Sequence, residues 1–410
     1  MRQLFILLMI PLAGYAQSGG DDAKIRKKAA RIHAGVYTLD THADVPMMMV
    51  KEGFDIGKEH DFTKEGSQID IPRMRKGGMD AMFFAVYLAQ GRRTPEGLAE
   101  AKQKALAIFD TIHNAIKRYP GDLGLATTPE DGPRLKKQGK IAVYIGMENG
   151  WPAGKDLSNL KLYYDLGARY ITLSHAANND ICDSSVDADG PEFNGLSPFG
   201  KEVVKEMNRL GMLVDISHVS DSTFYQVIRL TKAPVIASHS SCRALCDVPR
   251  NMTDDMIRTL AKNGGVIQIN FVPGFVKKPS QEYELSVRPL ILRSRKPELS
   301  REDQEMIQKE INTLKEKYAP DMPTVKDAVD HIDHVVKLVG IDHVGIGMDL
   351  DGGGEVIGVR DVSQIGAITE ELVRRGYSKK DIEKIWSGNT MRILKEAEKI
   401  SAGIRKSGLM

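Results

Sequence analysis

The sequence predicts an α/β protein, a single TIM-type (β/α)8 barrel with extra C-terminal helices and an insertion after the seventh strand. Eight short apolar runs mostly alternate with segments of helical spacing, which is the pattern of parallel βαβ units. Eight such units close a barrel of this type. Most of the runs also end in a histidine or a carboxylate, and the catalytic groups of such barrels lie at the carboxyl ends of the strands.

The predicted strands and helices follow one another along the whole chain. The first strand belongs to the stretch 37–46, YTLDTHADVP, and the others cover 81–87, 141–148, 170–175, the run ending at His218, the run ending at His239, 266–271 and 344–349. Helical spacing predicts helices at 21–31, 94–118, 157–166, 198–210, from Ser220 onward, and at 253–262, 325–338, 362–375, 379–385 and 389–400. Residues 47–71 and 176–198 are expected to be polar loops, the second at the rim of an active site.

The segment 273–323 interrupts this alternation. It is charged and contains one stretch of helical spacing, 301–317, so we expect an insertion between the seventh and eighth strands. A solvated excursion is favoured over a lid or an oligomer contact.

Composition and charge exclude several classes of protein. The chain has 410 residues, of which 41% are hydrophobic, enough for a large core and against intrinsic disorder. The formal net charge is only +2, basic and acidic residues are interspersed, and no nucleic-acid-binding signature is present. We therefore expect no nucleic-acid partner.

Residues 1–16 have the pattern of a secretory signal peptide. Arg2 supplies a short positive region, LFILLMIPLAG an apolar core, and Gly14-x-Ala16 a cleavage site. The core is shorter than the roughly 20 residues of a membrane span, and no cysteine follows it for lipid attachment. We expect residues 17–410 to form one barrel domain, exported to the periplasm or secreted, with no stable membrane anchor. An uncleaved N-terminal anchor is the alternative.

The three cysteines, Cys182, Cys242 and Cys246, do not have the CxxC spacing of a zinc site. Their odd number leaves at least one unpaired within a monomer. A bridge from Cys182 to either of the others and three free thiols are both open at this stage.

The candidate functional residues end the apolar runs. His42 and Asp44 lie two residues apart, and side chains i and i+2 of a strand leave on the same face, so both could bind one cation. Later runs place five more side chains in the same way: Glu148, His175, His218, His239 and Asp349. The remaining histidines lie in helical or loop contexts and are expected to have surface or packing roles: His33, His60, His113, His331, His334 and His343.

Two cations account for this set better than one, because one cation needs about three of the ligands and leaves the others unexplained. We predict one site from His42, Asp44 and Glu148, and a second from Glu148, His218 and His239, with Glu148 as the bridge. Imidazole and carboxylate donors suit zinc, and a water shared by two such ions becomes a hydroxide nucleophile near neutral pH. Asp349, on the last strand, then suits the transfer of a proton.

A set of motifs resembles the membrane dipeptidases, or renal dipeptidases, within the metal-dependent amidohydrolase barrels. The motifs occur in the family's order: DTHADVP, GMENG, LSH followed by Asn178-Asn179, DISHVS, ASHSSCRALCDVPRN, GIGMDLDGG and SGNTMRIL. The HxD opening, where most related hydrolases have HxH, makes the resemblance specific. Unlike animal members, the chain ends without an obvious hydrophobic tail for a lipid anchor, and its cysteines do not suggest a full disulfide framework.

The resemblance implies a binuclear zinc enzyme that hydrolyses dipeptides, and it suggests a homodimer. It also implies that His175 contacts the substrate and polarises the developing oxyanion, while Arg250 holds the terminal carboxylate of the substrate.

Two other functions stay open on the sequence. One is another binuclear amidohydrolase that acts on a cyclic amide, a lactone or an N-acyl amino acid; such relatives often bridge the metals with a carboxylated lysine, where this chain has Glu148. The other is a non-catalytic metal-binding or solute-binding protein, which would have no need of Asp349 and His175 beside the metals.

Overall fold

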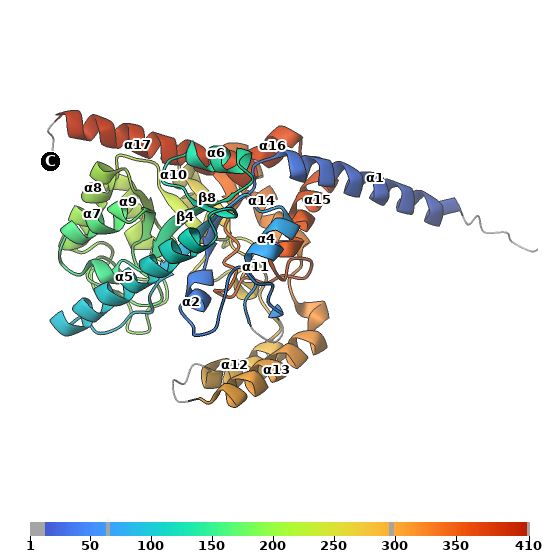
Figure 1. Ribbon diagram of the computed structural model, residues 1–410, viewed down its shortest axis with the longest axis horizontal. Coiled ribbons are helices and arrows are strands. Elements are labelled where there is room, and N and C mark those ends of the chain that lie inside the picture. The colour runs from blue at the N-terminus through green and yellow to red at the C-terminus, as the bar shows by residue number, and fades with distance from the viewer. Residues whose placement is uncertain (1–12, 63–65, 295–298, 408–410) are drawn as a thin grey trace, which may run out of the picture.

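The computed structural model describes residues 13–62, 66–294 and 299–407. Most of the predicted signal peptide lies outside these residues, and only 13–16 are described, at the start of helix α1 (Ala13–Gly35). This helix projects from the body of the protein (Figure 1). Among the described residues, no helix combines the length and the apolar character that crossing a membrane requires.

Eight parallel strands form the predicted barrel. Their order in the sheet is β1 (Leu39–Ala43), β2 (Ala81–Tyr87), β4 (Ile141–Glu148), β5 (Ala168–Thr172), β6 (Leu213–Asp215), β7 (Ile236–Ser240), β8 (Val266–Ile269) and β9 (Val344–Ile346). The two ends of the sheet meet just beyond β9, where the amide of Asp44 donates to the carbonyl of Leu350 at 2.9 Å and the amide of Asp349 donates to the carbonyl of His42 at 3.2 Å. The barrel fold is therefore confirmed.

Helices surround the barrel and follow most of its strands (Figure 1). They are α2 (Val45–Met49), α4 (Ile71–Gly77), α5 (Pro95–Arg118), α6 (Asp131–Lys137), α7 (Ser158–Asp165), α8 (Pro198–Leu210), α9 (Asp221–Leu230), α10 (Asp254–Lys262), α14 (Val325–Val339), α15 (Gly366–Arg374), α16 (Lys379–Glu383) and α17 (Asn389–Ser407). Hydroxyl side chains begin many of them; Ser197, for example, caps α8 by accepting a hydrogen bond from the Gly200 amide.

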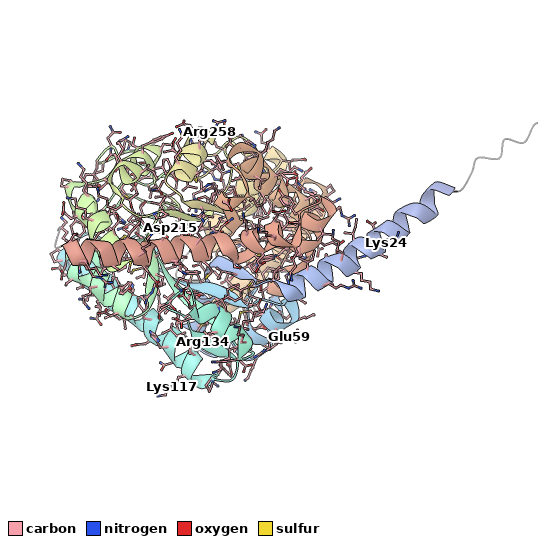
Figure 2. The ribbon with its side chains drawn as sticks, turned by 90° about the horizontal axis from the view of Figure 1, so that it is seen from above. Lys24, Glu59, Lys117, Arg134, Asp215 and Arg258 are labelled. Carbon is pink, nitrogen blue, oxygen red and sulfur yellow. The ribbon has the colours of Figure 1, made fainter. Side chains whose placement is uncertain are left out.

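The inside of the barrel is packed with side chains and closed at its amino end. Phe83, Tyr144 and Tyr170 are fully buried there, and Ile393 and Leu394 of α17 pack against the same cluster. Seen from above, α17 lies across this end of the barrel (Figure 2). The opposite end, where the strands finish, is the one that carries the polar side chains.

The predicted insertion lies between β8 and β9 and forms a helical hairpin. It consists of α11 (Pro273–Val276), α12 (Gln281–Ser294) and α13 (Arg301–Lys317), and only the last of these was predicted. The hairpin has a small core of its own and extends away from the barrel (Figure 1). Glu355, on the loop after β9, fastens it by accepting from Lys315 of α13 at 2.5 Å, and also accepts from Arg360 at 2.8 Å.

Several sequence predictions need correction. A short extra strand, β3 (Leu123–Leu125), pairs with β4 outside the barrel path, and α2 and α4 enter a segment that was expected to be a loop. Strands β5, β6, β8 and β9 end two or three residues earlier than predicted, because the polar residues at their ends turn into loops. For the same reason Asp44 does not share the face of a strand with His42; it occupies the position just before α2, where its side chain makes no capping hydrogen bond. All three cysteines are free and buried.

Candidate metal centre

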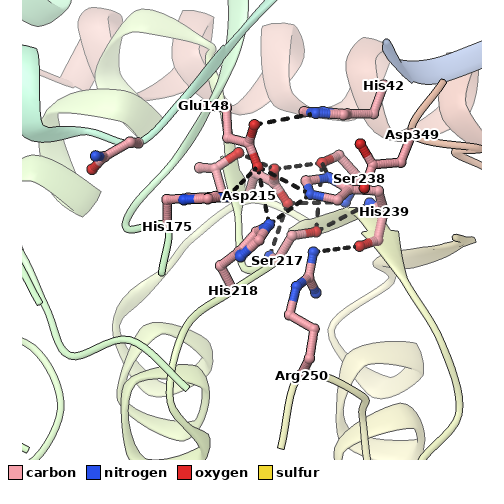
Figure 3. A network of polar contacts seen from close by, with 12 residues as sticks. His42, Glu148, His175, Asp215, Ser217, His218, Ser238, His239, Arg250 and Asp349 are labelled. Carbon is pink, nitrogen blue, oxygen red and sulfur yellow. Dashed lines mark hydrogen bonds and ion pairs between the residues drawn. The ribbon is translucent and has the colours of Figure 1, made fainter. Parts of the chain in front are cut away.

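The seven strand-end side chains that the sequence singled out meet at the carboxyl end of the barrel, around the carboxylate of Glu148 (Figure 3). The Nε2 atoms of His218 and His239 lie 3.0 and 3.2 Å from Glu148 Oε1. His42 Nε2 lies 3.4 Å from the other oxygen, Oε2, and His175 Nε2 lies 3.8 Å from Oε1. Four imidazoles from different strands therefore face one carboxylate.

Tyr170 fixes the orientation of His42. The Tyr170 hydroxyl donates to the carbonyl of Thr41 at 3.0 Å, so its oxygen is left to accept from His42 Nδ1, 2.8 Å away. With its proton on Nδ1, the His42 ring presents a bare Nε2 to Glu148. The tyrosine ring needs space to reach this position, and Gly146 provides it, since a Cβ at residue 146 would lie 2.0 Å from the ring.

Such an arrangement fits a cation. His42 Nε2 and Asp44 Oδ1 are buried and have no hydrogen-bond partner among the described residues. The lone pair of His42 Nε2 points at carboxylate oxygens, Glu148 Oε2 at 3.4 Å and Asp44 Oδ2 at 3.8 Å. Buried electron-rich atoms that face each other without a hydrogen between them repel, whereas imidazole and carboxylate around a divalent ion are ordinary ligands.

The charge states of the surrounding groups agree with this interpretation. Burial would raise the pKa of Glu148, but positive charge on the nearby His42 and His175, together with the close contacts of His218 and His239, holds that pKa well below its usual value. Burial, with the positive charge of Arg250 as a further cause, keeps the pKa of His218 well below its usual value. Burial, together with His42, does the same for the pKa of His239. His42 differs: burial would lower its pKa, but Tyr170 and the carboxylates of Glu148 and Asp44 raise that pKa well above its usual value, so the surroundings favour a positive charge at this position. An ionised carboxylate with neutral imidazoles is the state that binds a divalent metal ion.

The ligand atoms form three overlapping groups, each within 4.8 Å: His42, Glu148 and His239; Glu148, His175 and His218; and His42, Asp44 and Asp349. Each group is large enough to hold one ion. Distance alone does not separate ligands from other functional groups, because His175 and Asp349 lie as close as the predicted ligands.

Asp349 lies at the edge of this cluster, on the loop that follows β9. Burial, together with the carboxylates of Asp44 and Glu148, raises its pKa well above the usual value. Asn270 donates to Asp349 Oδ2 at 3.1 Å and holds the side chain in place. A Cβ at Gly352 would lie 2.1 Å from Asp349 Oδ1 and 2.2 Å from Asp44 Oδ2, so the loop passes very close to both carboxylates.

His175 and Arg250 have the surroundings of substrate-binding residues. The side chain of His175 is 23% exposed, and Tyr87 packs edge-on against its ring. The side chain of His42, by contrast, is fully buried. Arg250 is buried beside the cluster; its guanidinium donates to Ser240 Oγ at 2.8 Å and to the carbonyl of His239 at 2.7 Å, but its Nε has no partner among the described residues. Burial lowers the pKa of Arg250 to about 10.

The backbone at the site is strained. Asn149, His218 and Asp349 have φ values of 75°, 68° and 64°, a left-handed conformation that residues other than glycine rarely adopt. All three lie just beyond strands of the barrel. Strain of this kind persists where the surrounding structure fixes it, and it often marks functional sites.

Some functional neighbours were missed by the sequence interpretation. Asn270 directly follows β8, so the strand-end criterion that found the other residues would also have found it. Tyr170 and Ser238 lie inside strands, where an apolar or small polar residue gives no signal of its own. Asp215 is the last residue of β6, and it was passed over because the sequence interpretation extended that run to His218. The histidines expected to be structural are indeed outside the site; His331, for example, accepts a hydrogen bond from the Cys242 amide at 3.0 Å.

Comparison with known proteins identifies the family. The model of the membrane dipeptidases, peptidase family M19, matches residues 26–408. The chain belongs to the membrane dipeptidase family. It is accordingly a hydrolase, a metallo-dipeptidase, and the resemblance noted in its motifs is confirmed.

Individual relatives agree with the family assignment. The dipeptidase verJ of Clonostachys rogersoniana is 31% identical over 391 residues, which cover 93% of this chain and 89% of that protein. The dipeptidase tcpJ of Claviceps purpurea is 32% identical over 375 residues, 88% of this chain and 77% of that protein. The crystal structure of the probable dipeptidase PvdM from Pseudomonas aeruginosa is 31% identical, with a TM-score of 0.81, and the match covers 92% of this chain and 99% of that one.

A more distant structure shares the fold. A metallopeptidase from Rhodobacter sphaeroides, solved with a phosphinate mimic of the dipeptide L-Ala-D-Ala, has a TM-score of 0.71 at 22% identity, over 88% of this chain and 99% of that one.

The Tyr170–His42 contact leads to a prediction. In Tyr170→Phe the Nδ1–H of His42 loses its buried acceptor, which should lower the free energy of unfolding by about 1–3 kcal/mol and zinc affinity by about 10–100-fold. Urea unfolding and chelator competition measure the two effects. Tyr163→Phe is the matched control, because the Tyr163 hydroxyl donates to a buried carbonyl, that of Pro152, remote from the cluster. Unchanged zinc affinity in Tyr170→Phe would show that the contact does not orient His42.

Proposed function

We propose that the protein is an exported zinc dipeptidase with two zinc ions per chain. The observation that carries the proposal is the position of Arg250, a buried guanidinium whose Nε has no partner in the described part of the chain, beside a cluster of imidazoles and carboxylates that fits metal ions. A buried positive charge without a carboxylate partner is unfavourable unless a ligand supplies one. A dipeptide brings a carboxylate one residue away from its only peptide bond.

The zinc ligands are the two sets proposed from the sequence. We assign His42, Asp44 and Glu148 to one ion, and Glu148, His218 and His239 to the other. The ligand atoms that lie within 4.8 Å of one another divide differently, with His239 beside His42 and His175 beside His218. The geometry supports Glu148 as the shared ligand, because its two oxygens face different histidines: Oε2 faces His42, and Oε1 faces His218 and His239. Two bound zinc ions would supply an acidified water and polarisation of the scissile carbonyl.

The remaining residues handle the substrate and the proton. Arg250 holds the terminal carboxylate, and His175, the exposed imidazole of the cluster, donates a hydrogen bond to the oxygen on which negative charge develops. Asp349 accepts the proton of the attacking water and passes it to the leaving amine. Its hydrogen bond from Asn270 keeps one carboxylate oxygen occupied and leaves Oδ1 toward Asp44.

The alternatives are weaker. Membership of a peptidase family argues against a non-catalytic binding protein. An amidohydrolase acting on a cyclic amide or a lactone would not need a buried guanidinium for a free carboxylate. An N-acyl amino acid does offer a carboxylate, so this class belongs in the substrate panel described below.

Glu148→Gln should weaken both zinc sites together, since one side chain serves both. Elemental analysis of the purified variant should show less than one zinc per chain after dialysis, against two in the wild type. Loss of a single ion with the other retained at full occupancy would contradict the bridging role.

Asp349→Asn should retain most of its zinc and lose about 10²–10⁴-fold in kcat, because a general acid–base group is removed while the ligands stay. Steady-state kinetics on a dipeptide together with a metal count tests this. Asp342→Asn, an exposed carboxylate paired with Lys384, is the control and should behave like the wild type. Near-normal turnover in Asp349→Asn would exclude it as the proton carrier.

Export requires removal of the leader. N-terminal sequencing of the protein from the envelope or the medium of its own cells should begin near Gln17, as the Gly14-x-Ala16 pattern predicts. An intact Met1 on membrane-bound protein would support an uncleaved anchor instead.

The main test separates a dipeptidase from its rivals through Arg250. We expect the wild type to prefer free dipeptides over their C-terminal amides, because the amide leaves the guanidinium without its partner, at about 2–4 kcal/mol or 30–1,000-fold in kcat/KM. N-acyl amino acids keep the carboxylate, so their turnover in the same panel tests that rival directly. Arg250→Ala should lose activity mainly on the free dipeptide.

The matched control for this test is Arg243→Ala. Arg243 lies in the same loop, is paired with Asp221 at 2.7 Å, and should not change the ratio of free dipeptide to amide. Equal losses on free and amidated substrates in Arg250→Ala would mean that this residue has a structural role and that the carboxylate is bound elsewhere.

A further inference from the structure

A buried chain of hydrogen bonds leads from His239 away from the metal-binding face to Asp215 (Figure 3). His239 Nδ1 lies 2.8 Å from Ser238 Oγ, and Ser238 Oγ lies 2.6 Å from Asp215 Oδ2. None of the three side chains is accessible to solvent. The parallel register of the barrel places Asp215, the last residue of β6, beside β7 and beside Thr172 of β5.

The hydrogen bonds between His239, Ser238 and Asp215 have a definite donor-to-acceptor direction. Asp215 is surrounded by donors: its Oδ1 accepts from the amides of Ser217 at 3.0 Å and Ser238 at 2.9 Å, and its Oδ2 accepts from the hydroxyls of Thr172 at 2.5 Å and Ser238. These are the surroundings of a carboxylate, which only accepts hydrogen bonds. The single proton of the Ser238 hydroxyl therefore goes to Asp215. Ser238 Oγ is then left to accept, and His239 Nδ1 must carry the hydrogen.

The tautomer of His239 decides the state of the ring nitrogen that faces Glu148. With its proton on Nδ1, His239 has a bare Nε2, and this atom lies 3.2 Å from Glu148 Oε1. A neutral histidine binds a metal through the nitrogen that carries no proton. We propose that Asp215 is a positioning residue that fixes the tautomer of His239 through the Ser238 hydroxyl. The proposal deepens the proposed zinc function and rests on it for the identity of the ion.

The other histidines of the cluster are oriented differently. His42 is held by the neutral Tyr170 hydroxyl, and the buried Nδ1 of His218 has no partner among the described residues. On the side of each ring away from Glu148, only His239 of these three is connected, within the described residues, to a charged group; a hydroxyl links it to Asp215, and a bond that ends on a carboxylate is the stronger kind. His239 should therefore be the ligand that is best prepared before the metal binds.

Asp215→Asn tests the direction of these hydrogen bonds, because the new side chain has nearly the same shape as the old one. The two backbone amides at Oδ1 require the carbonyl of the new side chain, so its NH2 group must face Ser238. That NH2 donates to Ser238 Oγ, and the Ser238 proton turns to His239 Nδ1. The ring then carries its proton on Nε2 and presents N–H, where a ligand needs a lone pair.

Two further variants isolate the effect. Ser238→Ala removes the hydroxyl that links His239 to Asp215 without reversing the hydrogen bonds, so that His239 is free to adopt either tautomer. Thr172→Val removes another hydrogen bond to the same oxygen of Asp215 but leaves the path to His239 intact. It is the matched control for any general loss of packing around the carboxylate.

The experiment uses the full-length enzyme with two readouts. The imidazole nitrogen chemical shifts of zinc-free protein labelled with 15N-histidine report the tautomer of His239, assigned with His239→Gln, and chelator competition reports zinc affinity. Asp215→Asn should switch His239 to the Nε2–H form and weaken one of the two zinc sites by about 10–100-fold. Ser238→Ala should show both tautomers and a smaller loss of affinity. Thr172→Val should keep the Nδ1–H form and its zinc affinity.

The proposal is overturned if Asp215→Asn keeps the wild-type tautomer, or if all three variants lose zinc equally. Should Asp215→Asn fail to fold, a wild-type tautomer and wild-type zinc affinity in Ser238→Ala would overturn it as well. If wild-type His239 has the Nδ1–H tautomer but the protein binds no zinc, the role of Asp215 is supported and the proposed zinc function is rejected. Failure of the positioning role and failure of the zinc function are therefore distinguishable.

Discussion

The structure depends on one unfavourable contact that a cation converts into a favourable one. The carboxylate of Glu148 is buried among imidazole nitrogens; His42 Nε2 lies 3.4 Å from one of its oxygens and His239 Nε2 lies 3.2 Å from the other. Where these nitrogens carry no proton and no ion is bound, lone pairs face lone pairs in a medium of low dielectric constant. The barrel must therefore hold its ligands in place from behind, and the surrounding hydrogen bonds do so before any metal arrives.

The barrel supplies that support because its interior side chains change from apolar at the amino end to polar near the carboxyl end. Its amino end is packed with aromatic and aliphatic side chains and closed by α17, as Phe83 and Ile393 illustrate. Above this layer come Tyr170 and then Asp215 and Ser238, whose polar atoms are used to orient the histidines. Rigid packing below thus fixes the second layer, and the second layer fixes the ligands.

Charge is distributed unevenly around the site, and this asymmetry provides a basis for selecting the substrate. Glu148 and Asp44 concentrate negative charge on the metal side, whereas Arg250 lies buried on the other side with a donor to spare. Metals would compensate the first group, and an anionic group of a substrate would compensate the second. The strained backbone at His218 and Asp349 is of the kind that persists only where the surrounding structure fixes it.

The fold class and the metal-binding residue types could be read from the sequence, because both are local features. Strand–helix alternation predicts the barrel, and the carboxyl ends of parallel strands in a barrel meet at one rim, so His42, Glu148 and His239 could be brought together without coordinates. The insertion was located and one of its two long helices, α13, was predicted from its spacing. Helix α12 and strand β3 were not, since their sequences carry no distinctive period.

Only the tertiary structure decided which nitrogen of each histidine faces the metal side. That choice depends on contacts such as Tyr170 with His42, 128 residues apart in the chain, and Ser238 with Asp215, which lie on neighbouring strands. It also showed that Asp44 begins a helix instead of sharing a strand face with His42, and that Arg250 is buried with an unpartnered Nε. The physical reason is that side-chain type is encoded locally, whereas the direction of a hydrogen bond is set by the partners that the fold brings to it.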